Sequence, residues 1–182
     1  PGGAQEIFQV TPDITCLGKV LGGGLPLAAF GGRGEVMDLL APEGPVYQAG
    51  TLSGNPLAVA AGLATLKVLS QRGLYTSLER KGRRLQEGIE SILDRFHFPG
   101  LVNRVGSMLS LFFGRERVSD AEEARGCDRE RFVRFFHGML GRGIYFPPSP
   151  FEAAFVCVAH TDRDLAKTLQ AFEDWAREDS VG

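Results

Sequence analysis

The chain has 182 residues, of which 43% are hydrophobic and 23% are charged, a composition that suits one ordinary globular domain or two small ones. Its formal net charge of −2 leaves no basic excess of the kind that binds nucleic acid or an anionic membrane surface. No apolar stretch is long enough to cross a bilayer. We therefore expect neither a nucleic-acid partner nor a membrane partner.

The three cysteines, Cys16, Cys127 and Cys157, are odd in number and widely spaced. This pattern favours reduced thiols in a cytoplasmic protein over a disulfide framework. No pair of cysteines has the spacing of a zinc site, so we expect no metal. The chain begins at Pro1 without a charged and apolar leader, and we expect any targeting peptide to be absent or to lie upstream.

Residues 1–53 alternate short apolar runs with glycine-rich turns, which predicts strands and loops. The apolar run at residues 27–32 predicts a buried strand in a sheet that is covered on both faces. Asn55 and Pro56 supply an N-cap and a first-turn proline for an alanine-rich helix that continues to about residue 69.

Apolar stripes predict three helices in the second half of the chain. Leucines and isoleucines recur at helical spacing over residues 74–96. Asp128 is placed to cap a second, phenylalanine-striped helix, and Thr161 with Asp164 has the spacing of a capping box for a third. Short strands are expected at residues 108–113, 144–146 and 153–159, and an exposed loop is expected at residues 115–126.

These elements predict two domains. Residues 71–182 alternate helices with short strands, which indicates a small C-terminal α+β domain. Residues 1–70 hold a few strands and one helix whose apolar faces need partners. We expect them to be the remainder of a larger α/β domain that continues upstream.

Lys19 stands out among the four lysines because apolar residues flank it and three glycines follow at residues 22–24. A desolvated lysine amine gives up its proton more readily and can attack a carbonyl. The other three, Lys67, Lys81 and Lys167, lie in helical segments whose periodicity directs them to solvent. Spacing alone leaves a second interpretation open, in which Lys19 lies on a loop with its amine in water.

The glycines after Lys19 match neither common phosphate-loop template. Lys19 is followed by Val20 rather than by Ser or Thr, and no GxGxxG motif opens a helix after a strand. The glycines are better explained as room for the backbone to turn beside a bulky planar group.

The segment GTLSGNP at residues 50–56 leads directly into the expected helix. A helix N-terminus with the hydroxyls of Thr51 and Ser53 beside it suits an anion such as phosphate. An ordinary cap and turn would explain most of the segment, but it would leave Thr51 without a role.

Together these segments resemble the class-III (subgroup II) aminotransferases, which are pyridoxal-phosphate enzymes of fold type I. The resemblance covers nearly the whole chain and implies an α/β, aspartate-aminotransferase-like fold. This chain would then hold the end of the large domain and the α+β small domain. The segments that carry the resemblance are LGKVLGGGLP (17–26), AFGG (29–32), YQAGTLSGNP (47–56), RFVRFFH (131–137), PPSPFEAAF (147–155) and VAHT (158–161).

The resemblance also implies roles for single residues. Lys19 matches the catalytic lysine that forms the Schiff base with pyridoxal 5'-phosphate, and Thr51 matches the threonine that reaches the cofactor phosphate of the other subunit. A homodimer with shared active sites is thereby implied. Glu152 matches a glutamate near the substrate's amino groups, with Tyr47 and Ser53 beside the shared site. The family's other cofactor and substrate residues would lie upstream, so we expect the chain to be inactive alone.

Among the family's members, the sequence of residues 47–56 is similar to the matching segment of the aminomutases. These enzymes move an amino group between adjacent carbons of one small substrate in tetrapyrrole biosynthesis. Two alternatives remain. The parent protein could be an ordinary class-III aminotransferase with an ω-amino donor, or the chain could be a non-catalytic dimerisation module. Glu152 could also be a surface residue, and His137 and His160 are expected to be structural.

Overall fold

The computed structural model describes residues 2–181. They form two compact units, and the boundary between the units along the chain lies between Arg72 and Gly73. No helix in the described part of the chain is both long and apolar enough to cross a membrane.

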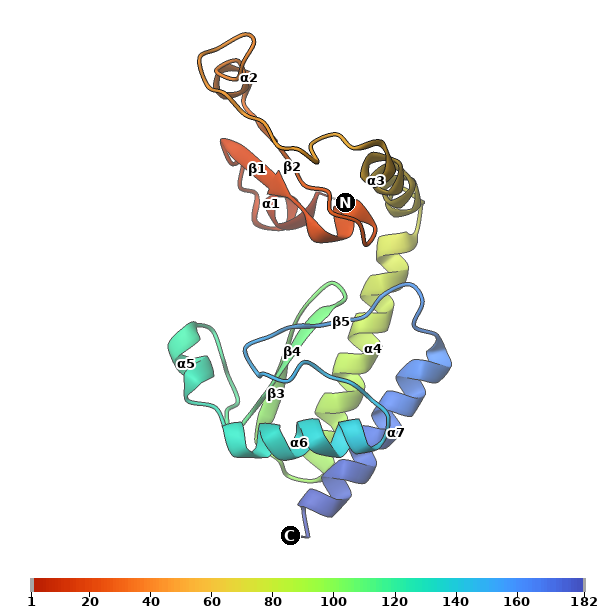
Figure 1. Ribbon diagram of the computed structural model, residues 1–182. Helices are drawn as coiled ribbons and strands as arrows, with labels where there is room; N and C mark the ends of the chain where they lie inside the picture. Colours follow the sequence, from red (N-terminus) through yellow and green to blue (C-terminus); the bar gives the residue numbers. More distant parts are fainter. Residues whose placement is uncertain (1, 182) are drawn as a thin grey trace. The chain divides into compact units, whose positions relative to one another are not determined.

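The first unit pairs two short strands and places a helix of 14 residues after them (Figure 1). The strands are antiparallel, with Ile14 opposite Gly32 and Leu17 opposite Ala29. The elements are α1 (Gly3–Phe8), β1 (Ile14–Leu17), the 3-10 helix η1 (Lys19–Gly22), β2 (Ala29–Gly32), α2 (Gly34–Met37) and α3 (Pro56–Leu69).

The helix that begins at Pro56 is confirmed. The Asn55 side chain accepts a hydrogen bond from the Ala58 amide at 3.0 Å, as an N-cap residue does. The prediction of strands and loops for residues 1–53 is incomplete, because this segment also contains the helices α1, η1 and α2. The strand expected within residues 27–32 is present as β2, but the described residues do not bury it on both faces. β2 pairs only with β1 among the described residues, and the side chain of Phe30 on β2 is 44% exposed.

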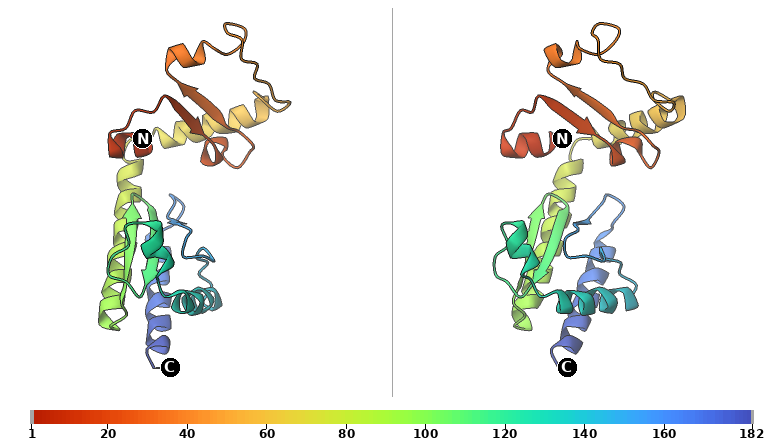
Figure 2. Two further views of the ribbon diagram at one scale, coloured as in Figure 1. Left: turned by 90° about the vertical axis from the view of Figure 1, so that its left-hand side faces the viewer. Right: turned by 60° about the vertical axis from the view of Figure 1, so that its left-hand side comes forward.

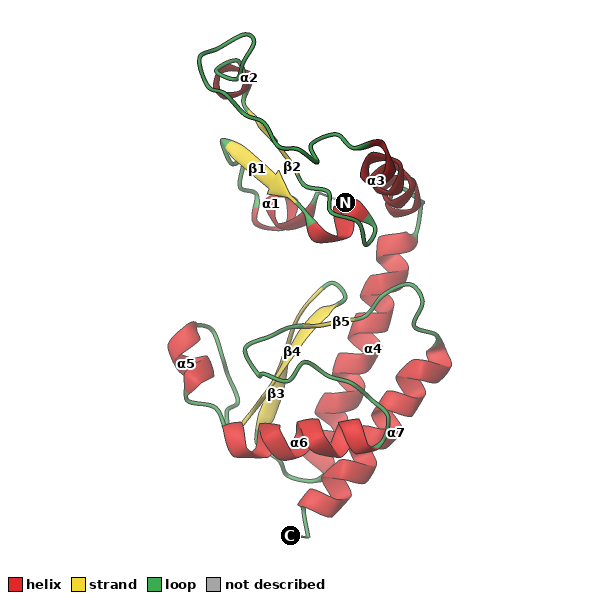
Figure 3. Ribbon diagram, viewed as in Figure 1, coloured by secondary structure: helices red, strands yellow, loops and turns green. Residues whose placement is uncertain are grey.

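The second unit packs four helices around a three-stranded antiparallel sheet of order β3-β4-β5 (Figures 1 and 3). The long helix α4 packs on β3 and on α7, and α6 packs on β4 and α7, an arrangement that can be followed from two further sides (Figure 2). The elements are α4 (Leu74–Arg95), β3 (Gly100–Val105), β4 (Met108–Phe113), α5 (Ala121–Arg125), α6 (Arg129–Gly141), β5 (Ala154–Phe155) and α7 (Asp162–Asp179).

Both predicted caps in this unit are confirmed. The Asp128 carboxylate accepts a hydrogen bond from the Arg131 amide at 2.9 Å, and Thr161 with Asp164 forms a reciprocal capping box. These caps fix where α6 and α7 begin. The start of each helix therefore follows from local sequence.

An aromatic cluster forms the centre of the core in the second unit. Phe135 of α6 is fully buried, and its ring lies 5.1 Å from that of Phe146 and 5.4 Å from that of Trp175, between ring centroids. Such tilted and edge-on aromatic contacts stabilise a core beyond the area they bury. The largest fully buried side chains are Phe113, Phe135, Phe172, Ile89, Leu93, Leu109 and Met139.

Several predicted elements of the second unit need correction. Residues 144–146 are not a strand, although Phe146 is buried, and the strand expected over residues 153–159 is only Ala154–Phe155. The expected loop 115–126 contains α5, which Asp120 caps and which buries Ala124. Phe146, Ala124 and Val156 are buried at these positions, whereas Tyr145, Phe155 and Val158 are exposed.

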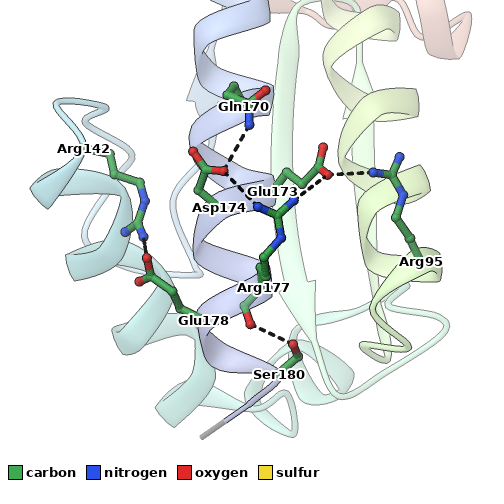
Figure 4. Close-up of polar contacts among 8 residues, drawn as sticks. All are labelled: Arg95, Arg142, Gln170, Glu173, Asp174, Arg177, Glu178 and Ser180. Carbon is green, nitrogen blue, oxygen red and sulfur yellow. Dashed lines mark hydrogen bonds and ion pairs between the residues drawn. The ribbon is translucent and has the colours of Figure 1, made fainter.

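Ion pairs and hydrogen bonds join the C-terminal half of α7 to its neighbours (Figure 4). Glu173 accepts hydrogen bonds from Arg95 of α4 at 2.8 Å and from Arg177 at 3.2 Å. Glu178 pairs with Arg142 at the end of α6. The arginines at these contacts range from partly buried to exposed, so each exposed pair contributes little by itself.

Asp179 differs from these surface pairs because its side chain is only 7% exposed. Its carboxylate lies 3.1 Å from Arg131 Nε and 2.6 Å from Arg134 Nε, both on α6. Burial alone would raise the pKa of this carboxyl. The hydrogen bonds and charges of Arg134 and Arg131 outweigh burial and hold the pKa below its usual value of 3.8.

We expect Asp179→Asn to lower the free energy of unfolding of the chain by about 1–3 kcal/mol at pH 7, because two arginines lose a charged partner. A lowered carboxyl pKa stabilises the fold above the unfolded pKa, and this stability is lost as the pH falls through the folded pKa. The gap between wild type and variant should therefore narrow below about pH 4. Urea unfolding followed by the fluorescence of the buried Trp175 measures it. Asp174→Asn, on the same helix but more exposed, is the matched control; an equal loss in both variants would contradict the prediction.

Candidate active site

Lys19 follows β1 after a single glycine, Gly18, and begins η1, with a left-handed backbone at φ 55°. Left-handed φ values are uncommon for residues other than glycine and are found at functional sites when the surroundings enforce them. The Lys19 side chain is exposed, and its neighbours Leu17 and Val20 are 54% and 67% exposed. The described residues do not bury this lysine, so its desolvation stays a prediction.

Local hydrogen bonds and close packing hold the turn that follows Lys19. The Leu21 amide donates to Gly18 O at 3.2 Å, and the Gly23 amide donates to Val20 O at 3.0 Å. A Cβ on Gly62 of α3 would collide with Leu27 and approach the Leu21 carbonyl. The absence of a side chain at Gly62 therefore lets η1 lie directly on α3.

The loop before α3 is a series of tight turns. The Ser53 amide donates to Gly50 O at 2.9 Å, and the Asn55 amide donates to Leu52 O at 3.2 Å. Asn55 supplies the cap of α3, and Thr51 is exposed with no hydrogen-bond partner for its hydroxyl within residues 2–181. The cap and turn therefore form without using Thr51, whose hydroxyl is left for another group near the positive end of the helix.

A hollow of about 650 Å³ opens in the first unit between the end of β1, the segment leading into β2 and the loop before α3. Of the predicted site residues, Ser53 lines it, whereas Lys19, Tyr47 and Thr51 do not. Tyr47 is 84% exposed. Gln48 also lines this hollow with its amide side chain, although it is not among the predicted site residues; its place between Tyr47 and Gly50 is the only sequence signal for it.

Glu152 belongs to the second unit, in the turn between α6 and β5. It is exposed and lines a hollow of about 610 Å³ beside α7. His160 lines the same hollow, and its Nδ1 accepts a hydrogen bond from the Cys157 amide at 3.0 Å, which supports a structural role.

One expectation about the lysines is wrong. Lys81 is not directed into solvent, because its amine donates hydrogen bonds to Val158 O at 3.0 Å and to His160 O at 2.6 Å. It joins α4 to the segment before α7. Among the described residues no group of three or more His, Cys, Asp or Glu side chains is arranged to hold a metal ion.

The geometry can be compared with known proteins. The sequence profile of aminotransferase class-III matches residues 3–174. A glutamate-1-semialdehyde 2,1-aminomutase from Desulfitobacterium hafniense is 57% identical over 173 residues, and one from Thermus thermophilus is 57% identical over 171 residues. These matches cover 95% and 93% of the chain but 40% of each relative. The chain thus spans about two fifths of the length of these relatives.

Solved structures agree in fold. A β-phenylalanine aminotransferase from Variovorax paradoxus superposes with a TM-score of 0.87 at 28% identity, over 98% of this chain and 41% of that one. A glutamate-1-semialdehyde-aminomutase from Pseudomonas aeruginosa PAO1 gives a TM-score of 0.81 at 24% identity, over 98% of this chain and 42% of that one. The expected fold type is confirmed, and the chain belongs to the class-III aminotransferase family.

Proposed function

We propose that this chain is part of an aminomutase that converts glutamate-1-semialdehyde, (S)-4-amino-5-oxopentanoate, into 5-aminolevulinate with pyridoxal 5'-phosphate as cofactor. The observation that carries the proposal is the 57% identity to relatives of that name, which extends over 95% of the chain. In this proposal residues 1–70 end the large cofactor-binding domain and residues 71–182 are the small domain.

The residues present fit such a cofactor. Pyridoxal phosphate supplies an aldehyde that accepts an amino group and an electron-withdrawing ring that eases proton removal from the attached carbon. Lys19 offers a primary amine at the start of a tight turn, in which Gly22 and Gly23 allow the backbone to pack closely. The hydroxyls of Thr51 and Ser53 precede the N-terminus of α3, where a phosphate group is favoured.

In this mechanism Lys19 both holds the cofactor and carries protons. Its amine would hold the cofactor and, when free, could act as a general base that passes a proton from one carbon of the substrate to the next. The left-handed backbone at Lys19 and the packing of η1 on α3 set the direction in which the side chain leaves the backbone. A fixed starting point favours transfer between two neighbouring carbons.

Thr51 is proposed to act on the cofactor phosphate of a second subunit, so that the enzyme is a homodimer with shared sites. Its exposed hydroxyl has no partner within the described residues, as such a role requires. Glu152 is proposed to receive the ammonium groups of the substrate, since a carboxylate is their natural partner. Tyr47 and Ser53 are proposed to line the shared site.

A second candidate is transamination between an ω-amino donor and a 2-oxo acid. The likeness to an omega-transaminase from Sphaerobacter thermophilus, with a TM-score of 0.84 and 29% identity, favours it. The two activities differ in their need for an acceptor. An aminomutase turns over the semialdehyde alone, whereas a transaminase needs a 2-oxo acid.

The first test of the proposal is formation of 5-aminolevulinate by the full-length enzyme and by its Lys19→Ala variant. Loss of the amine should lower kcat by about 10³-fold or more, because both cofactor attachment and proton transfer depend on it. Lys67→Ala, an exposed lysine on α3, is the matched control and should stay active. A Lys19→Ala enzyme with near wild-type turnover would refute the assignment.

Mixed dimers test whether Thr51 acts across subunits. A dimer of one Thr51→Val subunit and one Lys19→Ala subunit should contain one site with both defects and one intact site. We expect each heterodimer, purified from the co-expressed variants, to have about half of the activity of a wild-type dimer. Heterodimers that form but remain inactive would show that Thr51 serves its own subunit.

For Glu152→Gln we expect kcat/KM for the semialdehyde to fall at least about tenfold, since a charged hydrogen bond to the substrate is replaced by a neutral one. Cofactor content and thermal stability should not change. Glu87→Gln, an exposed glutamate on α4, is the control. Unaltered kinetics of Glu152→Gln would contradict the proposed role and favour the alternative that Glu152 is an ordinary surface residue.

A further inference from the structure

The carboxylate of Glu152 has no side-chain or backbone partner of its own within residues 2–181. It is exposed at the edge of the 610 Å³ hollow. The backbone that carries it therefore sets which positions its flexible side chain can reach. Whatever fixes that backbone controls how well the carboxylate is placed.

The backbone at Glu152 is the last position of a four-residue turn that begins at Ser149. The Glu152 amide donates to the Ser149 carbonyl at 3.1 Å. Pro150 occupies the second position, where its fixed φ favours a turn, and serine is favoured at the first. In addition, the Phe151 amide donates to Ser149 Oγ at 3.2 Å. Ser149 thus accepts from both amides that follow the proline.

Both ends of this turn are attached to the rigid part of the second unit. Before it, Phe146 is buried in the aromatic cluster against Phe135. After it, Ala154 pairs with Leu109 of the central strand β4. The guanidinium of Arg129 lies 5.7 Å from the centre of the Phe151 ring, which is half exposed. The ends are held by core and sheet, but the middle is held mainly by Ser149.

The prolines cannot do this alone. Proline at 147, 148 and 150 fixes φ at those three positions. The φ and ψ of Phe151, the residue directly before Glu152, are not fixed in this way, and the backbone hydrogen bond from the Glu152 amide to the Ser149 carbonyl restrains them only in part. The hydrogen bond from the Phe151 amide to Ser149 Oγ restrains that residue.

We propose that Ser149 is a positioning residue that acts through Glu152, its hydroxyl holding the turn in the form that directs the Glu152 carboxylate to the substrate's amino groups. This role rests on the proposed function of Glu152. A carboxylate that samples several directions binds and orients an ammonium group less well, although the protein remains folded. Removal of the hydroxyl should therefore affect catalysis rather than stability.

A double-mutant cycle in the full-length enzyme tests the proposal. Ser149→Ala should lower kcat/KM for the semialdehyde by about 3–10-fold in the wild-type background and by less than about 2-fold in the Glu152→Gln background. Ser149→Thr keeps a hydroxyl and should restore most of the activity. Ser180→Ala removes a hydroxyl that donates to Arg177 O at 2.9 Å at the end of α7 and is the matched control. Cofactor content and melting temperature are measured for every variant.

Each outcome decides between the two claims. Equal losses from Ser149→Ala in both backgrounds, no loss in either, or failure of Ser149→Thr to restore activity would overturn the role of Ser149 and leave the proposed function intact. A wild-type enzyme that makes no 5-aminolevulinate from the semialdehyde would overturn the proposed function and the role of Ser149 with it. A loss confined to the background with Glu152, recovered by threonine, supports both.

Discussion

Close packing of η1 on α3 is the constraint on which the arrangement of the first unit depends. Gly62 offers no side chain at the point where the Leu27 side chain and the Leu21 carbonyl approach the helix, so both can lie directly against the helix backbone. The same helix that supports the Lys19 turn is preceded by the loop with Thr51. A single contact thereby fixes the amine and the hydroxyls of the proposed cofactor site to one element.

In the second unit, the turn that carries Glu152 is held in place although it lies outside any helix or strand. The capped helices α6 and α7 and the strand β4 enclose an aromatic cluster centred on Phe135. Phe146 packs in that cluster and β5 pairs with β4, so both ends of the segment between them, residues 147–153, are held in place. The backbone at Glu152 can then be held by a few local hydrogen bonds, as its proposed role toward the substrate requires.

Local signals in the sequence predicted the parts of the fold that depend on local chemistry. Asn55, Asp128 and the Thr161 capping box identify helix starts because a cap needs only its own first turn. Residues 144–146 and 153–159 were assigned as strands because their apolar side chains suit a sheet, but Phe146 is buried by the aromatic cluster instead. Whether an apolar run pairs or only packs depends on distant neighbours that the sequence does not display.

The candidate site residues could be predicted from the sequence less directly than the helix starts. The glycine run and the helix N-terminus point to Lys19 and Thr51, but each allows an ordinary explanation until both are combined in one family pattern. Gln48 and Ser149 lie within the segments 47–56 and 147–155 that carry the family resemblance, but no pattern in those segments assigns a role to either residue. The lining of a hollow and the hydrogen bonds of a turn appear only when the chain is folded.

The central claim is that Lys19 is the residue that holds the cofactor. Borohydride reduction of the full-length enzyme, followed by proteolysis and mass spectrometry, makes that link permanent and locates it. The account predicts that the added phosphopyridoxyl mass lies on Lys19, within the peptide that spans residues 17–26. The same mass on Lys67, Lys81, Lys167 or a lysine outside this chain, with Lys19 unmodified, would contradict it.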